Sequence, residues 1–503
     1  MVVGTTSLWL SSLRLSNMSR ATEYKPLTAI WEVTMGCNMR CGHCGSSCEE
    51  RLPDELTTDE ALSLIDQVAD LGLKWITLSG GEPLIREDLP ELVQKFASRS
   101  VAVNIITNGW LIDSKMAQQL KNSGVSTVAI SIDGTEKTHD SIRKNGSFMR
   151  ICEAATHLKN AGVTIGAVTT VSNNNINSLS ELHNMLSTMG VASWQLQLGQ
   201  PMGNFKKRPE WVITPEQVPR IIDFCYEASF DGTIRIFTAD CIGYYTKKEM
   251  MVRQISGGSA SIWNGCNAGI RSFGILHNGD ILGCTSIREK SFVEGNIRNQ
   301  PLSHIWSNPE NFAWRRKMSK EHLEGDCAIC TYGSKCLGGC PNTRLTMNGD
   351  IHSENRYCIY NLSLKRMRNY LQSENDIQWL IAQSKQSVDN NDFQTAAFLM
   401  KRVLSIEPEN KKALAIAGFV EFMCGNYTLC ESANRKALEL DPSDTYAMKG
   451  LGLALHKLGD SVRGLEYLEQ AAKLTNYTDK DIMNDLAFVW KELGQVDLEL
   501  PAG

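Results

Sequence analysis

The sequence of 503 residues lacks the features that define several classes of protein. It has no run near the roughly 18 consecutive apolar residues that a membrane-spanning helix needs, which argues against a membrane protein. A formal net charge of −5 leaves no excess of basic residues, so the composition also argues against a nucleic-acid partner. The length and an ordinary hydrophobic content of 42% predict about two to four domains, each with a core of its own.

The first 26 residues form an N-terminal extension that lacks a clean export signal. Residues 2–17 contain no acidic side chain, but their apolar residues are interrupted and no small-residue cleavage site follows. Two interpretations stay open for this segment: a weak targeting peptide, or translation that starts at Met18. Without an export signal, the sequence predicts a cytoplasmic location, where cysteine thiols stay reduced.

Cysteine is abundant instead. Sixteen cysteines are present, and most fall into groups with the spacing of metal ligands rather than the pattern of a small disulfide-rich protein. The first group is Cys37-x3-Cys41-x2-Cys44. Three thiolates on one loop can bind three irons of a [4Fe–4S] cluster and leave the fourth iron open to a small molecule. A zinc site is the alternative, with Cys48 as a fourth ligand.

Residues 27–234 alternate between short β-rich runs and segments with helical periodicity. The six β-rich runs are residues 30–34, 75–79, 101–107, 127–132, 163–171 and 194–198. Thr57 and Glu60 form a capping box that predicts the start of the first helix. This pattern predicts an α/β fold, a partial (β/α)6 TIM-like barrel, in which chemistry lies at the carboxyl ends of the strands. The cysteine trio follows the first of these strands.

The cysteine trio and the motifs after it resemble the signature of the radical S-adenosylmethionine (radical SAM) superfamily. That signature is C-x3-C-x2-C after the first barrel strand, followed by a GGEP motif at the end of the second strand. The resemblance implies that S-adenosylmethionine is held by nine residues: His43, Gly80, Gly81, Glu82, Pro83, Asn108, Ser131, Asp133 and Arg143.

The resemblance also implies a role for several of these residues. Glu82 complements the ammonium group of the methionine moiety, and Ser131 and Asp133 face the ribose or the methionine carboxylate. Arg143 pairs with that carboxylate, because a guanidinium matches it with two hydrogen bonds. His43 stands where the family usually carries an aromatic residue, and we expect its backbone to contact adenine.

A second group of cysteines resembles the SPASM domain, whose pattern is C-x9–15-G-x4-C, a gap, C-x2-C-x5-C-x3-C, a gap and C. The resemblance implies a SPASM domain over residues 235–370 with two auxiliary [4Fe–4S] clusters. The first would be bound by Cys266, Cys284 and Cys340, and the second by Cys327, Cys330, Cys336 and Cys358. A zinc ribbon is the alternative.

The cysteines do not account for every ligand. Three clusters need eleven cysteines if only the first cluster has an open iron, and ten are assigned. Cys241 is the candidate for the missing ligand of the first auxiliary cluster, and Cys225 is a weaker one. That iron could equally stay open and receive substrate. Three other cysteines lie on predicted helical faces and are expected to be buried: Cys152, Cys424 and Cys430.

Residues 377–503 repeat with a period of 34 residues. Pro408 and Pro442 are one period apart, as are Gly418 and Gly452. This is the period of tetratricopeptide repeats (TPR), helical hairpins that stack into an all-α solenoid with a groove suited to peptides. The sequence predicts about three repeats and a capping helix over residues 481–493. The alternative is a module for self-association or stabilisation.

Together the resemblances predict a radical SAM/SPASM maturase with three [4Fe–4S] clusters. Such an enzyme takes an electron from a flavodoxin- or ferredoxin-type reductant, cleaves S-adenosylmethionine to a 5′-deoxyadenosyl radical and abstracts hydrogen from its substrate. SPASM enzymes commonly modify ribosomally made peptides, so we expect a peptide or protein that receives a thioether or C–C crosslink or a side-chain oxidation. A small-molecule or cofactor-precursor substrate and a non-catalytic iron–sulfur scaffold stay open. No catalytic residue is predicted, since Asp240, Glu32 and several tyrosines could each be a base.

Overall fold

The structure is a computed structural model that describes residues 24–254, 262–371 and 373–493. The two interpretations of the N-terminal extension concern residues outside this range. The chain divides into two units. We call Glu23–Ala328 with Gly333–Leu362 the α/β unit, and Ile329–Tyr332 with Ser363–Gly503 the helical unit.

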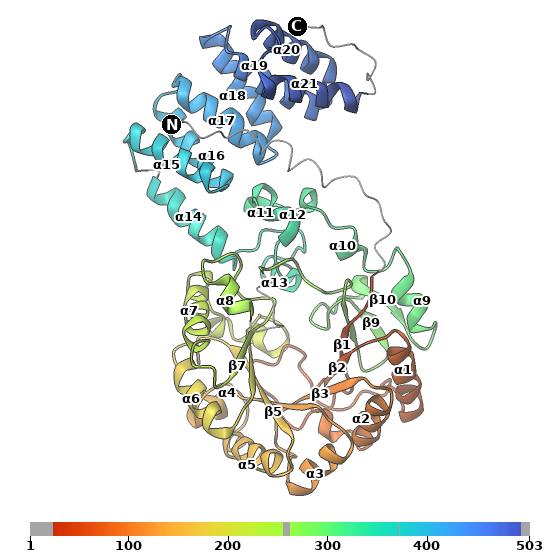
Figure 1. The fold of residues 1–503 in the computed structure, drawn as a ribbon. Coiled ribbons are helices and arrows are strands. Elements are labelled where there is room, and N and C mark those ends of the chain that lie inside the picture. Colours follow the sequence, from red (N-terminus) through yellow and green to blue (C-terminus); the bar gives the residue numbers. More distant parts are fainter. Residues whose placement is uncertain (1–23, 255–261, 372, 494–503) are drawn as a thin grey trace. The chain divides into compact units, whose positions relative to one another are not determined.

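The described part of the α/β unit is built on a ten-stranded sheet, in the order β10-β9-β8-β1-β2-β3-β4-β5-β6-β7 (Figure 1). Seven strands follow one another in parallel: β1 (Thr28–Glu32), β2 (Trp75–Ser79), β3 (Ala102–Thr107), β4 (Thr127–Ser131), β5 (Thr164–Val171), β6 (Ser193–Leu198) and β7 (Arg235–Thr238). The first six overlap the six predicted runs. β7 was not predicted, because four residues are too few to show a periodic pattern.

Three further strands extend the sheet beyond β1. β8 (Ser272–Ile275) pairs in parallel with β1, although it lies far later in the chain. β9 (Asp280–Leu282) returns antiparallel to β8, and β10 (Val293–Asn296) pairs with β9. The turn residue Gly279 has a φ of +86°, a conformation that glycine adopts without strain. The sheet is therefore mixed, and larger than the six-stranded parallel barrel that the sequence predicted.

Helices pack against the outer side of the parallel strands (Figure 1). They are α1 (Thr58–Asp70), α2 (Leu89–Ser98), α3 (Ser114–Asn122), α4 (Glu136–Ile142), α5 (Ser147–Asn160), α6 (Leu179–Met189) and α7 (Val218–Ala228). The predicted capping box is present at α1, where Thr57 and Glu60 each accept a hydrogen bond from the other's backbone. Trp31, Ile76 and Phe96 belong to one continuous apolar core, so polar chemistry is left to the loops at the strand ends.

The described residues between β7 and residue 372 contain further helices, most of them short. They are α8 (Glu249–Gln254), α9 (Leu302–Ser307), α10 (Ala313–Arg316), α11 (Gly325–Ile329), α12 (Gly333–Cys336), α13 (Pro341–Asn348) and α14 (Ile359–Leu371). Part of this segment has only a small apolar cluster of its own, built on Met318, Leu323 and Cys327. A small core of this kind is typical of segments that depend on metal ligands for stability.

The described residues 373–493 of the helical unit form seven helices. They are α15 (Ile377–Asp389), α16 (Phe393–Ile406), α17 (Lys411–Met423), α18 (Tyr427–Leu440), α19 (Thr445–Lys457), α20 (Ser461–Leu474) and α21 (Lys480–Glu492). Asp or Asn side chains accept N-cap hydrogen bonds at most of these helices, for example Asp376 and Asn410. Among all described helices, none combines the length and apolar character needed to cross a membrane.

Candidate active site at the carboxyl ends of the strands

The loop between β1 and α1 carries the cysteine trio, and hydrogen bonds join its two ends. The carboxylate of Glu55 accepts hydrogen bonds from Thr34 Oγ1 (2.9 Å) and Met35 N (2.8 Å), which joins the end of the loop to its start. Cys37 N donates to Glu49 O (2.7 Å). These bonds hold the backbone in place, so the loop presents its thiols from an ordered scaffold.

Gly80 and Gly81 let the end of β2 pack directly on this loop. A Cβ on Gly81 would lie 2.0 Å from Gly36 O, and a Cβ on Gly80 would lie 2.4 Å from Thr34 O. Two backbone hydrogen bonds of 2.8 Å, from Gly81 N to Thr34 O and from Glu82 N to Gly36 O, join the segments. The glycine pair therefore allows close approach to the chain's own backbone, where the motif alone suggested approach to a ligand.

Glu82 is fully buried, and protein donors already bind its carboxylate. Oε1 accepts from Thr107 Oγ1 (2.7 Å) and Leu84 N (3.1 Å), and Oε2 accepts from Asn108 N (2.8 Å). Burial raises the pKa of Glu82, and these donors oppose the rise. Glu82 thus ties the end of β2 to the end of β3, while Oε2 keeps a lone pair for a further donor such as an ammonium group.

Asp133 follows β4, is fully buried and joins the cysteine loop to the end of that strand. Its Oδ2 accepts from Arg143 Nε (2.6 Å) and contacts His43 Nε2 (2.8 Å), and its Oδ1 accepts from Thr170 N (2.9 Å). Burial disfavours the charge, but Arg143 and His43 outweigh it and hold the pKa of Asp133 below its usual range. The side-chain contact of His43 is new, since the sequence predicted only a backbone role.

Arg143 is oriented so that part of its guanidinium remains available. Its Nε binds Asp133, its two terminal nitrogens bind no described residue, and its side chain is 10% exposed. Burial lowers the pKa of Arg143, but Asp133 and Cys41 raise it by more than burial lowers it. The guanidinium group is therefore charged. A charged guanidinium in this position can pair with a carboxylate, as the sequence predicted.

The remaining predicted contacts lie beside these groups. Asn108 Nδ2 donates to Asn38 Oδ1 (2.7 Å) in the cysteine loop. Ser131 is the buried last residue of β4, and Pro83 begins the short helix η2 (Pro83–Ile85). All nine residues predicted to contact S-adenosylmethionine thus gather at the carboxyl ends of β1 to β4 and the loops that follow them.

The cysteine trio fits a [4Fe–4S] cluster. All sixteen cysteines lie within the described residues, and none forms a disulfide. Cys41 and Cys44 lie within electrostatic reach of Cys37. Burial raises the pKa of Cys37 to about 11, and bound iron would lower it because a metal ion stabilises the thiolate. The S–H group of Cys48 donates a hydrogen bond to the sulfur of Cys44, which lowers the pKa of Cys44.

The donor geometry also bears on the zinc alternative. Among the described residues, no three His, Cys, Asp or Glu side chains converge on a point that could hold a single metal ion. Zinc needs such a point, because all its ligands bind one atom. In a [4Fe–4S] cluster, each thiolate binds a different iron.

The three cysteines predicted to bind the first auxiliary cluster lie within electrostatic reach of one another. Cys284 and Cys340 both raise the pKa of Cys266, after the larger effect of burial. N–H or O–H groups donate to two of the sulfurs: Ala268 N to Cys266 Sγ (3.4 Å) and Thr343 to Cys340. Hydrogen bonds of this kind stabilise the thiolates of iron–sulfur sites.

Cys241, the predicted further ligand, is enclosed in the apolar core. Its Sγ accepts a hydrogen bond from Leu198 N (3.3 Å), and the residue is 9% exposed. Cys225, the weaker candidate, is 1% exposed on α7. Of the cysteines expected to be buried, Cys424 and Cys430 are, whereas Cys152 on α5 is partly exposed.

The predicted ligands of the second auxiliary cluster are all buried: Cys327, Cys330, Cys336 and Cys358. Backbone N–H groups donate to two of these sulfurs, Asn355 N to Cys327 Sγ and Tyr332 N to Cys330 Sγ, each at 3.4 Å. Two of the four buried sulfurs therefore have N–H donors of the kind that stabilises thiolates in iron–sulfur sites.

Comparisons with known proteins decide the family. The model of the radical SAM superfamily matches residues 31–186, and the SPASM model, an iron–sulfur cluster-binding domain, matches residues 266–331. An AdoMet-dependent heme synthase of Methanosarcina barkeri is 32% identical over 346 residues, which cover 67% of this chain and 97% of that protein. This chain belongs to the radical SAM superfamily. A mycofactocin maturase of Mycolicibacterium smegmatis is 30% identical over 325 residues, covering 63% of this chain and 78% of that protein.

Solved structures share the fold of this chain. Streptococcus suis SuiB bound to its precursor peptide SuiA superposes with a TM-score of 0.53 at 17% identity, covering 66% of this chain and 75% of that chain. The enzyme anSMEcpe with bound AdoMet and Cp18Cys peptide gives a TM-score of 0.53 at 19% identity, covering 69% and 96%. At these identities the likeness shows the fold alone.

One partly buried ion pair of this radical SAM enzyme was not predicted as a pair. Arg288, after β9, donates to Glu32 Oε1 at the end of β1 and to Ser46 Oγ (2.6 Å) in the cysteine loop. Burial raises the pKa of Glu32, and Arg288 opposes the rise. The sequence named Glu32 only as a candidate base and carried no signal for Arg288, because the partners are far apart in the chain. The pair links the SPASM segment to the loop of the first cluster.

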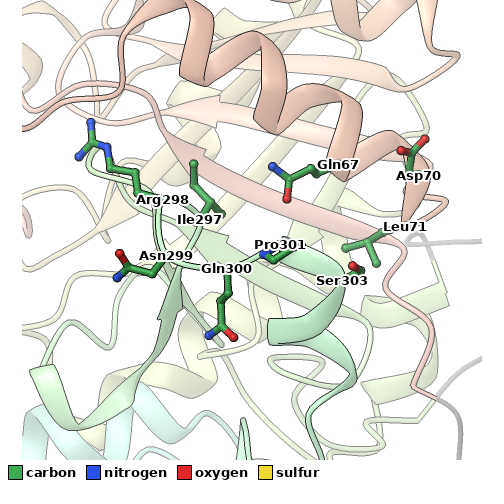
Figure 2. A pocket seen from close by; sticks show the side chains of 9 residues that line it. All are labelled: Gln67, Asp70, Leu71, Ile297, Arg298, Asn299, Gln300, Pro301 and Ser303. Carbon is green, nitrogen blue, oxygen red and sulfur yellow. The ribbon is translucent and has the colours of Figure 1, made fainter.

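A pocket of about 530 Å³ lies elsewhere in the α/β unit of this radical SAM enzyme, between the end of α1 and the segment after β10 (Figure 2). Gln67 and Asp70 line it on one side, and Arg298 and Gln300 on the other. Arg298 is bound to Glu60 (2.6 Å). None of the residues that line the pocket is a cysteine or a predicted cosubstrate contact, so we assign it no role.

Proposed function

We propose that this chain is a radical SAM/SPASM maturase that binds S-adenosylmethionine at the carboxyl ends of β1 to β4 and abstracts hydrogen from a peptide or protein. One observation carries the proposal: the cysteine loop, Glu82, Asp133 and Arg143 form a connected polar site. The loop meets Glu82 through the glycine pair and meets Asp133 through His43. A cluster that only transferred electrons would need no such groups for an amino acid beside it.

The residues of the site divide the work. The thiols of Cys37, Cys41 and Cys44 would hold the first cluster, which would bind S-adenosylmethionine. Arg143 pairs with the methionine carboxylate, Glu82 receives the ammonium group, and Asp133 orients Arg143 and His43. When bound, the cluster supplies the electron that converts S-adenosylmethionine into a 5′-deoxyadenosyl radical. The surrounding loops position the substrate and exclude water.

Two auxiliary [4Fe–4S] clusters belong to the proposal. A SPASM domain over residues 235–370 would hold them, with a radical SAM domain over residues 27–234 and TPR over residues 377–503. An external flavodoxin- or ferredoxin-type protein would supply the first electron. The auxiliary clusters would accept an electron from the product radical or bind a group of the substrate. Backbone N–H donors to the sulfurs of Cys266 and Cys327 support the two sites.

The helical unit supports a peptide or protein substrate. Helices α15, α17 and α19 begin at residues 377, 411 and 445, and helices α16, α18 and α20 begin at residues 393, 427 and 461. Both series have a spacing of 34 residues, which is the period of TPR. Stacked repeats of this kind form extended surfaces that bind peptides. The helical unit would therefore hold the substrate peptide.

A small-molecule substrate is the second candidate, and a specific relative favours it. The AdoMet-dependent heme synthase is matched over 97% of its length, and a Fe-coproporphyrin III synthase of the same organism is 25% identical over 362 residues. The mycofactocin maturase is matched at a similar identity, so identity alone does not choose between the two substrate classes. The helical unit is the feature that favours the peptide.

Release of 5′-deoxyadenosine tests the reaction. Chain reconstituted with iron and sulfide and reduced with dithionite is expected to release 5′-deoxyadenosine from S-adenosylmethionine. The Cys41→Ala variant is expected to release none, because the first cluster loses a ligand. If the wild-type chain holds its iron and still releases no product, the chain is a non-catalytic scaffold and the proposal is wrong.

Product mass tests the substrate class. Peptides encoded beside the gene are co-expressed with the enzyme, and a loss of two hydrogens per event is expected for a crosslink or an oxidation. Fe-coproporphyrin III is the competing probe in the 5′-deoxyadenosine assay. If Fe-coproporphyrin III raises the rate of release and no neighbouring peptide does, the small-molecule candidate replaces the peptide.

A further inference from the structure

The turn after β7 brings a carboxylate to the three cysteines of the first auxiliary site. β7 ends at Thr238, and Asp240 lies in the turn that follows. The carboxylate of Asp240 accepts a hydrogen bond from the thiol of Cys266. It also lies within electrostatic reach of Cys284 and Cys340. Asp240 is therefore hydrogen-bonded to one of the three thiols and lies within electrostatic reach of the other two.

A buried tyrosine fixes the position of Asp240 relative to these cysteines. Tyr244 Oη donates to the backbone oxygen of Asp240 (2.5 Å) and accepts from Cys340 N (2.9 Å). Gly339 makes room for the ring, because a Cβ there would lie 2.6 Å from it. One hydroxyl group thus joins the two backbone segments that carry Asp240 and Cys340. The protein itself holds the carboxylate and the thiol in place.

Two arginines favour the charged form of Asp240. Burial raises the pKa of Asp240, and the charges of Arg253 and Arg315 oppose the rise. Both arginines are held in place: Arg315 Nε donates to Cys266 O (2.9 Å), and Arg253 Nε donates to Glu249 Oε1 (2.6 Å). The two arginines therefore place positive charge beside the carboxylate of Asp240.

Cys241 is the competing ligand, and its surroundings differ from those of Asp240. The sulfur of Cys241 accepts a hydrogen bond from Leu198 N (3.3 Å) and is enclosed in the apolar core. Cys241 also lies within electrostatic reach of one of the three thiols, that of Cys340. Asp240 acts on the thiols of Cys266, Cys284 and Cys340 alike and is hydrogen-bonded to that of Cys266.

We propose that Asp240 supplies the fourth ligand of the first auxiliary [4Fe–4S] cluster, through a carboxylate oxygen, beside Cys266, Cys284 and Cys340. With one carboxylate and three thiolates, each of the four irons would have a protein ligand. Asp240 would then be the one ligand that the assigned cysteines do not supply. Carboxylate oxygens bind iron in other protein sites. A fully ligated cluster relays electrons and does not bind substrate directly. This inference rests on the proposed auxiliary cluster, and the experiment below separates the two.

Electron paramagnetic resonance of the full-length chain tests the ligand. Cys37→Ala, Cys41→Ala and Cys44→Ala are combined to remove the first cluster, so that the reduced auxiliary clusters are observed alone. In this background, Asp240→Ala is expected to shift the g-values and the midpoint potential of one cluster and to leave the other unchanged. Added 13C-cyanide is expected to bind the cluster of the Asp240→Ala protein alone, because its iron has lost a ligand. Cys241→Ala is the matched control and is expected to leave the background spectrum unchanged.

Several results would overturn the assignment. An Asp240→Ala spectrum identical to the background would do so, as would a background protein whose first auxiliary cluster binds cyanide. A change caused by Cys241→Ala would move the ligand to that residue. Asp240→Cys is expected to restore a cluster that excludes cyanide, which separates loss of a ligand from loss of the fold. If the background protein bound no iron at all, the auxiliary clusters themselves would be refuted, and the ligand with them.

Discussion

His139 shows how burial sets the charge of a side chain at this site. Its Nδ1 accepts a hydrogen bond from Asp133 N (3.2 Å), and the residue is fully buried. Burial and the positive charge of Arg143 lower the pKa of His139 to about 4, although Asp133 acts in the opposite direction. The imidazole is therefore neutral in the folded chain at pH 7, which suits its role as an acceptor. The hydrogen bond between Asp133 and His139 thus links the end of β4 to α4.

Stability is expected to depend on pH through His139. The unfolded chain protonates His139 below pH 6.5, whereas the folded chain does so only below about pH 4. The free energy of unfolding is therefore unaffected by His139 above pH 6.5. It falls by up to about 3 kcal/mol as the pH decreases from 6.5 to 4. Urea unfolding of the reduced chain without iron measures this loss. His139→Gln keeps an acceptor but does not titrate, so its stability should change less between pH 6.5 and 4. Equal slopes for variant and parent would contradict the prediction.

At the scale of elements, the contact between β2 and the cysteine loop decides whether the first cluster can form. The end of β2 lies against the loop so closely that a Cβ on Gly81 has no room, since it would lie 2.0 Å from Gly36 O. Gly45 lies in the same loop, directly after Cys44, but a Cβ there would meet Met202 Cβ at an ordinary 3.7 Å. Gly45 therefore has room for a Cβ, whereas Gly81 does not.

Gly81→Ala is expected to displace the cysteine loop and to prevent assembly of the first cluster. Bound iron should fall by about a third if the chain carries three [4Fe–4S] clusters, and 5′-deoxyadenosine release should be lost. Gly45→Ala is the control and should keep both the iron and the activity. Iron analysis and electron paramagnetic resonance after reconstitution measure the effect. Full iron in Gly81→Ala, or equal loss in Gly45→Ala, would show that close packing is not the reason for the glycine pair.

The pairing of β8 with β1 makes the SPASM segment part of the same sheet, and the Glu32–Arg288 pair lies beside this junction. Arg288→Met leaves the buried carboxylate of Glu32 without its partner, so we expect a loss of about 3–5 kcal/mol in the free energy of unfolding. Adding Glu32→Gln removes the stranded charge and should restore part of that loss. Urea unfolding of the chain without iron measures both variants. An Arg288→Met chain as stable as the parent would show that the pair does not stabilise the junction.

The parts of the fold that the sequence predicted depend on neighbouring residues. The six parallel strands and the capping box at α1 each follow from a local pattern. β7 and β10 have four residues each and show no periodicity, so they were missed. The pairing of Glu32 with Arg288 joins distant segments. Asp240 was only a candidate base, because its place beside three cysteines depends on the turn after the missed β7.

At the scale of the whole molecule, two units carry separate parts of the proposed function. Every predicted cosubstrate contact lies in the α/β unit, whereas the helices with a 34-residue spacing lie in the helical unit. The helical unit has apolar clusters of its own, for example around Leu399 and around Leu468. Binding of S-adenosylmethionine and binding of a peptide are therefore expected to be separable by deletion.

Deleting residues 377–503 is expected to leave iron content and S-adenosylmethionine binding intact, because the residues that hold them remain. Peptide affinity should fall at least about 10-fold, since a loss of roughly 1.4 kcal/mol or more is expected when a binding surface is removed. Equilibrium binding of the neighbouring peptide measures the change, and the affinity for S-adenosylmethionine reports whether the truncated chain is folded. Unchanged peptide affinity in a folded truncated chain would contradict a peptide-binding role for the helices.

The pairing of β1 with β8 also has a consequence for how the chain is made. β1 leaves the ribosome early, but its partner β8 must wait until Ser272–Ile275 has been synthesised. At about 5 to 20 residues per second, that delay lasts roughly 10 to 50 s. During this time one edge of β1 offers unpaired backbone groups to other chains. Iron delivered in that interval would meet a cysteine loop that still lacks its Arg288 contact, so cluster insertion should be most productive after translation has passed residue 288.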